Sequence, residues 1–172
     1  MVKNMFFIVD SSFLILLYEL NYLDLINKMM EICHNFIVTK QVFNELKRGN
    51  EIMALIGNGK FHKNIEPDEK SWKKISFRFP QLGSGETSIL SVSRDCKSSE
   101  KVCLLDNKHA RDAADLLHQD KHGTVWFIEE CYKVRIISKD EALIILRNIR
   151  NHSFWLDKKI LIDTITRISR EK

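Results

Sequence analysis

Two aspartates stand directly after short apolar runs that are typical of buried strands. Asp10 follows Met5 to Val9, and Asp106 follows "KVCLL", residues 101 to 105. Continuous apolar runs of this length, rich in β-branched and aromatic residues, favour strands that are buried on both faces. Parallel strands of an α/β sheet end at one common edge, where such folds bind their ligands. We therefore expect both carboxylates at the binding edge of a sheet.

Two glutamates on predicted helices lean toward the buried side of those helices. Glu86 lies in the first turn of its helix, and Ile89 and Leu90 follow it at helical spacing. Residues three and four positions apart share one helix face, so Glu86 lies on or beside the apolar face. Glu45 borders the apolar stripe of another helix, three residues after Val42. Four acids from four separate segments thus have a reason to point inward.

Four carboxylates at one edge would favour a bound divalent cation. Carboxylates that lie within a few ångströms of one another repel, and some of them would take up protons. Oxygen ligands of this kind suit Mg²⁺ or Mn²⁺, which need few carboxylates and keep several waters. Such an ion lowers the pKa of a bound water and neutralises charge that develops on a phosphate. The donor set predicts a metal-dependent phosphodiesterase.

Each of these acids also has a purely structural interpretation. An aspartate after a strand commonly caps the next helix, which applies to Asp10 and to Asp106. Glu86 would stabilise the positive end of its helix dipole, and Glu45 would pair with Arg48 on an exposed helix face. The combination of two Asp-tipped strands with two inward-leaning glutamates favours the metal site over four separate structural roles.

Strands and helices alternate along the chain. Further strands are expected at 35–39, where Thr39 would cap the next helix, at 62–67, and within 122–127. Helices are expected at 13–20, 23–30, 40–49, 52–56, around Trp72, from the N-cap Ser84 onward, and at 107–118. This alternation predicts an α/β fold, a three-layer α/β/α sandwich with a central parallel sheet.

The length suits one domain that spans residues 1–172. Its core would cover about 1–135, and a helical C-terminal extension would cover about 138–172, with a break near His152. The apolar stripe of the last helix would dock on the domain or be buried in a homodimer.

Composition excludes several classes of protein. A net charge of +4 permits a polyanionic partner but does not require one. The four cysteines form no CxxC pair, so we interpret them as small hydrophobic residues of a reducing compartment. No apolar run is long enough to span a membrane, and the first one is too short for a signal peptide. We expect a soluble, cytoplasmic protein that has no membrane partner.

Five segments together resemble a known family. "FIVDSSFLILLYELNYLDLI", "FIVTKQVFNELKRG", "LGSGETSILSVSRD" and "VCLLDNKHARDAADLL" are similar to successive blocks of the PIN domain family. One branch of bacterial and archaeal PIN proteins also has a Gly-Thr pair before a helix, as in "HGTVWFIEECYKVRII", and a helical tail. The resemblance implies a PIN-like fold and a nuclease that depends on Mg²⁺ or Mn²⁺. Many PIN domains, such as VapC-type toxins, cleave RNA, so RNA is the implied substrate, and an antitoxin is a further partner to consider.

The resemblance also assigns roles to individual residues. It implies four catalytic acids, of which Asp10, Glu86 and Asp106 would bind the metal ion directly, whereas Glu45 would act through water. The substrate-binding residues that it implies are Ser11, Ser12, Asn107 and Arg111.

Asn107 is a departure from the pattern, because relatives in this branch often carry a second aspartate there. Asparagine still offers a neutral oxygen, but the site has one negative charge fewer.

Two classes of function remain open. The first is a metal-dependent endoribonuclease in which Arg111 or the nearby Lys108 positions a backbone phosphate. The second is a non-catalytic PIN-like module that binds RNA or a protein, for which Asn107 would be a sign of a decayed site. Acyl-transfer and redox chemistry have no support, because no serine or cysteine stands in a nucleophile motif.

Overall fold

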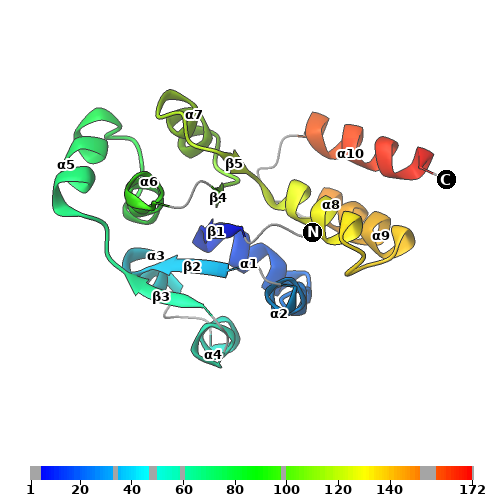
Figure 1. Ribbon diagram of the computed structural model, residues 1–172. Coiled ribbons are helices and arrows are strands. Elements are labelled where there is room, and N and C mark those ends of the chain that lie inside the picture. Colours follow the sequence, from blue (N-terminus) through cyan, green and yellow to red (C-terminus); the bar gives the residue numbers. More distant parts are fainter. Residues whose placement is uncertain are drawn as a thin grey trace.

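A five-stranded parallel sheet forms the centre of the protein. The computed structural model describes residues 5–32, 35–46, 50–58, 61–97, 100–151 and 158–171. The strand order is β3-β2-β1-β4-β5 (Figure 1). The strands are β1 (Phe6–Val9), β2 (Asn35–Thr39), β3 (His62–Ile65), β4 (Lys101–Leu104) and β5 (Lys121–His122). All four neighbouring pairs are parallel, as the sequence predicts.

Helices cover both faces of this sheet and complete the three-layer α/β/α sandwich (Figure 1). On one face α6 packs on β1, β2 and β4, and α5 packs on α6. On the other face Phe127 of α8 lies edge-on to Phe7 and Phe36, with ring centroids 6.3 and 6.2 Å apart. The helices are α1 (Ser11–Glu19), α2 (Asp24–Glu31), α3 (Lys40–Glu45), α4 (Asn50–Asn58), α5 (Glu69–Arg78), α6 (Ser84–Asp95), α7 (Lys108–Leu116), α8 (Thr124–Lys133), α9 (Lys139–Asn151) and α10 (Lys158–Arg170).

The N-caps of α3 and α6 show where these helices begin. The hydroxyl of Thr39 accepts a hydrogen bond from the backbone N–H of Val42 (3.3 Å), which confirms Thr39 as the cap of α3. Ser84 was expected to cap α6, but that expectation is wrong: Gly83 is the N-cap, and Ser84 is the first helical residue. The helix expected over 40–49 is shorter than predicted, because α3 ends at Glu45 and Leu46 is its C-cap. Gly49 itself and the expected break near His152 lie outside the described residues.

The strand order creates a topological switch point between β1 and β4. From β1 the chain continues toward β2 on one side, whereas from β4 it continues toward β5 on the other. Open α/β sheets bind ligands in the crevice beyond the strand ends at such a point. Val9 pairs with Leu104, and the backbone N–H of Asp10 donates to the carbonyl of Leu104 (3.3 Å). Asp10 and Asp106 therefore follow neighbouring strands at the same edge of the sheet, one and two residues beyond the last paired position.

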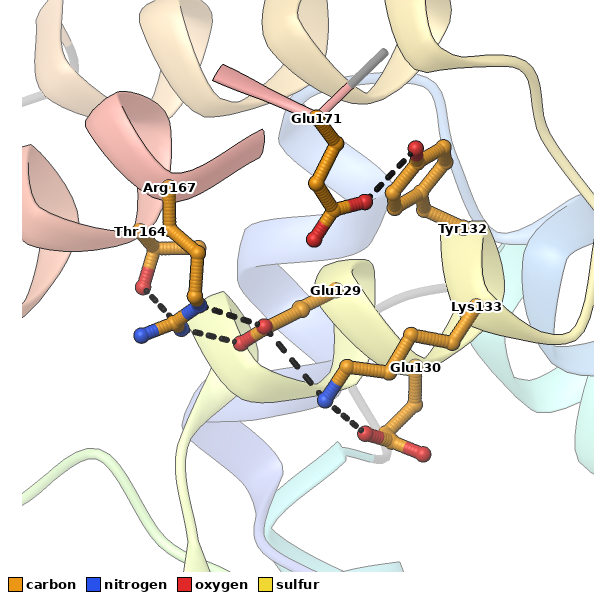
Figure 2. A network of polar contacts seen from close by, with 7 residues as sticks. All are labelled: Glu129, Glu130, Tyr132, Lys133, Thr164, Arg167 and Glu171. Carbon is orange, nitrogen blue, oxygen red and sulfur yellow. Dashed lines mark hydrogen bonds and ion pairs between the residues drawn. The ribbon is translucent and has the colours of Figure 1, made fainter. Parts of the chain in front are cut away.

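The C-terminal helix α10 docks on α8 and α9, which confirms the expectation of a docked tail. Leu161, Thr164 and Ile168 of α10 are buried. Figure 2 shows the polar contacts that hold this helix, centred on the buried carboxylate of Glu129. Arg167 donates two hydrogen bonds to Glu129, of 2.9 and 2.6 Å. In the parts of the chain described here, no helix is both long and apolar enough to cross a membrane.

We expect Arg167→Ala to lower the free energy of unfolding by about 2 kcal/mol, because it leaves the buried Glu129 carboxylate with fewer donors. Lys133 remains 3.3 Å from Glu129 and limits the loss. Urea denaturation measures the change, and Arg170→Ala, on an exposed residue of the same helix, is the matched control. Equal stability of the two variants would contradict a role of this ion pair in holding α10.

Candidate active site

Asp10 is a buried carboxylate at the end of β1, with only 5% of its surface exposed. It caps α1 by accepting hydrogen bonds from the backbone N–H of Ser12 (3.4 Å) and from the Ser12 hydroxyl. Among the described residues, no Lys, Arg or His forms an ion pair with it. Asp10 thus caps α1, as its structural interpretation predicts. The cap role alone does not explain why this carboxylate is buried with no cation beside it among the described residues.

Burial raises the pKa of Asp10 to about 6. The Ser12 hydroxyl opposes this effect, and the negative charges of Glu86 and Glu45 add to it. A raised pKa is what we expect of an acidic cluster. Loss of hydration is nevertheless a larger cause than repulsion between the acids.

Glu45 connects α1 with the start of α6. Its carboxylate accepts hydrogen bonds from the Ser11 hydroxyl (2.8 Å), the backbone N–H of Gly85 (2.9 Å) and the Ser84 hydroxyl (3.3 Å). A Cβ atom at position 85 would lie 2.7 Å from both carboxylate oxygens, so a glycine there admits the close approach of Glu45. The N-terminus of α6 also favours a negative charge at this place.

Glu86 lies in the first turn of α6, half-buried, and its carboxylate accepts a hydrogen bond from the backbone N–H of Gly83 (3.0 Å). This is the structural role considered for Glu86, and the structure shows it. Glu86 is nevertheless the first of the two charges that raise the pKa of Asp10. The structure therefore brings Asp10, Glu45 and Glu86 into one electrostatic neighbourhood.

Asp106 is buried beyond the end of β4, with 5% of its surface exposed. Its carboxylate accepts hydrogen bonds from the backbone N–H (2.8 Å) and the hydroxyl (2.5 Å) of Thr124. A Cβ atom at position 123 would lie 2.6 Å from its Oδ1, so Gly123 permits this approach. Burial raises the pKa of Asp106, and the Thr124 hydrogen bonds and the Arg111 charge lower it.

The four acids share one edge of the sheet, but their side chains do not form a ready-made ligand set. Within the described ranges, no three His, Cys, Asp or Glu side chains are grouped so that they could hold a metal ion. Glu45, Glu86 and Asp106 each accept a hydrogen bond from a backbone N–H in this arrangement. The donors still fit Mg²⁺ or Mn²⁺ in kind, because they are carboxylate oxygens, and two of them are buried with raised pKa values.

Asn107, expected to contact substrate, has a structural role that was not predicted from the sequence. Its side-chain oxygen accepts hydrogen bonds from the backbone N–H groups of His109 (2.8 Å) and Ala110 (3.3 Å), so it caps α7. Asp106 is therefore not the cap of this helix. Asparagine is among the best N-cap residues, which explains the residue at position 107 without any decay of the site.

Three residues near the acids were missed as parts of the site: Gly85, Gly123 and Thr124. The signal in the sequence was the Gly-Thr pair, which supplies the N-cap and the first residue of α8. A small residue followed by a hydroxyl residue at a helix start can receive a carboxylate from a neighbouring strand.

Asp10→Asn should stabilise the protein in EDTA at pH 8 by about 2 to 3 kcal/mol, because asparagine keeps the cap and has no charge to bury. A raised pKa in the folded state means that the wild type loses stability as pH rises from about 4 to about 6. The variant should not lose stability in this range. The difference in free energy of unfolding between variant and wild type should therefore grow between about pH 4 and about pH 6. Urea denaturation between pH 4 and 8 tests this, with Asp163→Asn on the exposed face of α10 as control. A difference in free energy of unfolding that does not change with pH would contradict the raised pKa of Asp10.

Comparison with known families agrees with this architecture. A family model described as a PIN domain matches residues 6–170, nearly the whole chain. A search of curated proteins found no significant match. PIN domains are typically nucleases, and they generally use divalent metal ions. The match across almost all of the chain, together with the parallel sheet, shows that this protein belongs to the PIN domain family.

Proposed function

We propose that this protein is a Mg²⁺- or Mn²⁺-dependent endoribonuclease. The observation that carries the proposal is Asp10, a buried carboxylate without a cationic partner among the described residues, placed at the switch point of the sheet. Glu45 and Glu86 add negative charge around it, and Asp106 emerges from the neighbouring strand. A divalent cation would balance these charges.

The four acids would have different roles in hydrolysis. Asp10, Glu86 and Asp106 would hold the ion, which when bound supplies an activated water and neutralises charge on the phosphate. Glu45 lies on the exposed side of the cluster, beside Ser11, and would orient the attacking water. Asp106 is already fixed by Thr124, so its carboxylate is held in place before substrate arrives.

Basic and hydroxyl groups beside the acids would bind the substrate. Arg111 lines the same cavity as Asp106, and no described residue forms an ion pair with its guanidinium. It is therefore suited to position a backbone phosphate. Ser11 and Ser12 would contact the same backbone from the start of α1. A role as the toxin of a toxin–antitoxin pair in the cytoplasm, like that of VapC-type toxins, is consistent with this chemistry.

A non-catalytic module that binds RNA or protein is the second candidate. One observation favours it, namely that the described residues contain no ready-made group of three metal ligands. In such a module Asp10 would only cap α1, and asparagine would replace it without consequence.

The test is cleavage of generic single-stranded RNA with Mn²⁺ by Asp10→Asn and Asp106→Asn. We expect each variant to lose more than about a hundredfold in rate, which exceeds the usual effect of removing a group that only supports a ligand. Each should also lose the rise in melting temperature that Mn²⁺ gives the wild type. Asp163→Asn should behave like the wild type in both assays. Cleavage at the wild-type rate by both active-site variants would end the catalytic proposal and favour the binding module.

A further inference from the structure

A cavity of about 170 Å³ opens beside Asp106 and is not explained by the hydrolytic site. Asp106 and Arg111 are among its lining residues, His122 and Trp126 provide aromatic rings, and Thr164 and Arg167 come from α10. Whatever occupies this cavity lies next to a carboxylate that we propose as a metal ligand. The cavity is therefore in reach of the nucleotide whose phosphate is cleaved.

Two aromatic rings form a flat, uncharged plate in this cavity. The imidazole of His122 stacks on the indole of Trp126, with ring centroids 4.0 Å apart and an interplanar angle of 11°. Trp126 in turn lies edge-on to Phe7 of the core, which anchors the plate. Burial lowers the pKa of His122 and so favours the neutral ring, whereas Asp120, 3.6 Å away, acts in the opposite direction; 35% of the His122 side chain remains exposed. Proteins stack unpaired bases on aromatic rings of this kind.

The two arginines that line the cavity differ in their partners. Arg111 offers a charge that no described residue neutralises by an ion pair. Arg167, in contrast, is paired through two hydrogen bonds with the buried Glu129, and a third contact joins it to the Thr164 hydroxyl (3.3 Å) (Figure 2). Arg111 suits a phosphate, whereas the paired Arg167 and Glu129, the Thr164 hydroxyl and the aromatic plate add no net charge to the lining. Such surroundings suit a neutral polar ring.

We propose that this cavity binds the base of a nucleotide adjacent to the scissile phosphate of single-stranded RNA, which makes α10 part of the substrate site. The inference rests on the proposed function and names its substrate class. A base can enter the cavity only when it is unpaired, so single strands should bind and duplexes should not. The ion pair between Arg167 and Glu129 would then also serve substrate binding, because it holds two lining side chains in place before substrate binds.

The experiment measures fluorescence anisotropy of short, labelled single-stranded RNAs with the full chain in EDTA, and KM for the same RNAs with Mn²⁺. His122→Ala should weaken binding and raise KM by about tenfold or more, and His122→Phe should restore most of the affinity. The matched control is His62→Ala on the opposite edge strand β3, which should change neither quantity. Thr164→Leu, which narrows the cavity from α10, should also weaken binding, whereas Thr166→Leu, on an exposed residue of the same helix, should not.

The outcomes separate this inference from the proposed function. If the wild type cleaves RNA but His122→Ala and Thr164→Leu bind and cleave as their controls do, the cavity proposal is wrong and the nuclease stands. If RNA binding depends on His122 and Thr164 but the wild type does not cleave with Mn²⁺, the nuclease is wrong and the cavity proposal stands. Equal affinity for duplex and single-stranded RNA would also overturn the proposed base site.

Discussion

The burial of two carboxylates at the tips of neighbouring strands is the constraint around which the rest of this structure is arranged. Asp10 and Asp106 are each 95% removed from solvent, and burial raises the pKa of both. A protein tolerates buried carboxylates only when hydrogen bonds or a cation compensate for lost hydration. Each carboxylate accepts a backbone N–H and a hydroxyl from one residue at a helix start, Ser12 for Asp10 and Thr124 for Asp106. The charge of Arg111 also lowers the pKa of Asp106, whereas among the described residues no cation forms an ion pair with Asp10.

The fold supports this arrangement by pointing helix N-termini at the acids. The first residues of α6 donate to Glu45 and the N-cap of that helix donates to Glu86, while the start of α8 donates to Asp106. Gly85 and Gly123 allow these approaches, because a side chain at either position would collide with a carboxylate. The topological switch between β1 and β4 places the acids where the sheet edge is open to a ligand. The same constraint thus accounts for the two glycines and for the donors at the starts of α6 and α8.

Much of this architecture could be predicted from short-range patterns. The apolar runs before Asp10 and Asp106 identify the two central strands, and Thr39 marks both the end of β2 and the cap of α3. The contacts that could not be predicted join residues far apart in the chain. Nothing local to Asp106 indicates that Thr124 holds it, and nothing local to Glu129 indicates Arg167 on α10. A short strand was expected within 122–127. The structure has the two-residue strand β5 at Lys121–His122, and α8 begins at Thr124, so the strand exists but its bounds were not predicted. A strand this short leaves no periodic signal, although it supplies His122 to the cavity.

The account depends most on where a divalent cation binds. Anomalous diffraction from crystals that contain saturating Mn²⁺ locates the ion directly, without reference to activity. We predict a strong anomalous peak between the carboxylates of Asp10 and Asp106, at the carboxyl ends of β1 and β4, and no peak there in crystals of Asp10→Asn. Saturated wild-type crystals that show no peak at these strand ends, or show the ion only elsewhere, would contradict the account.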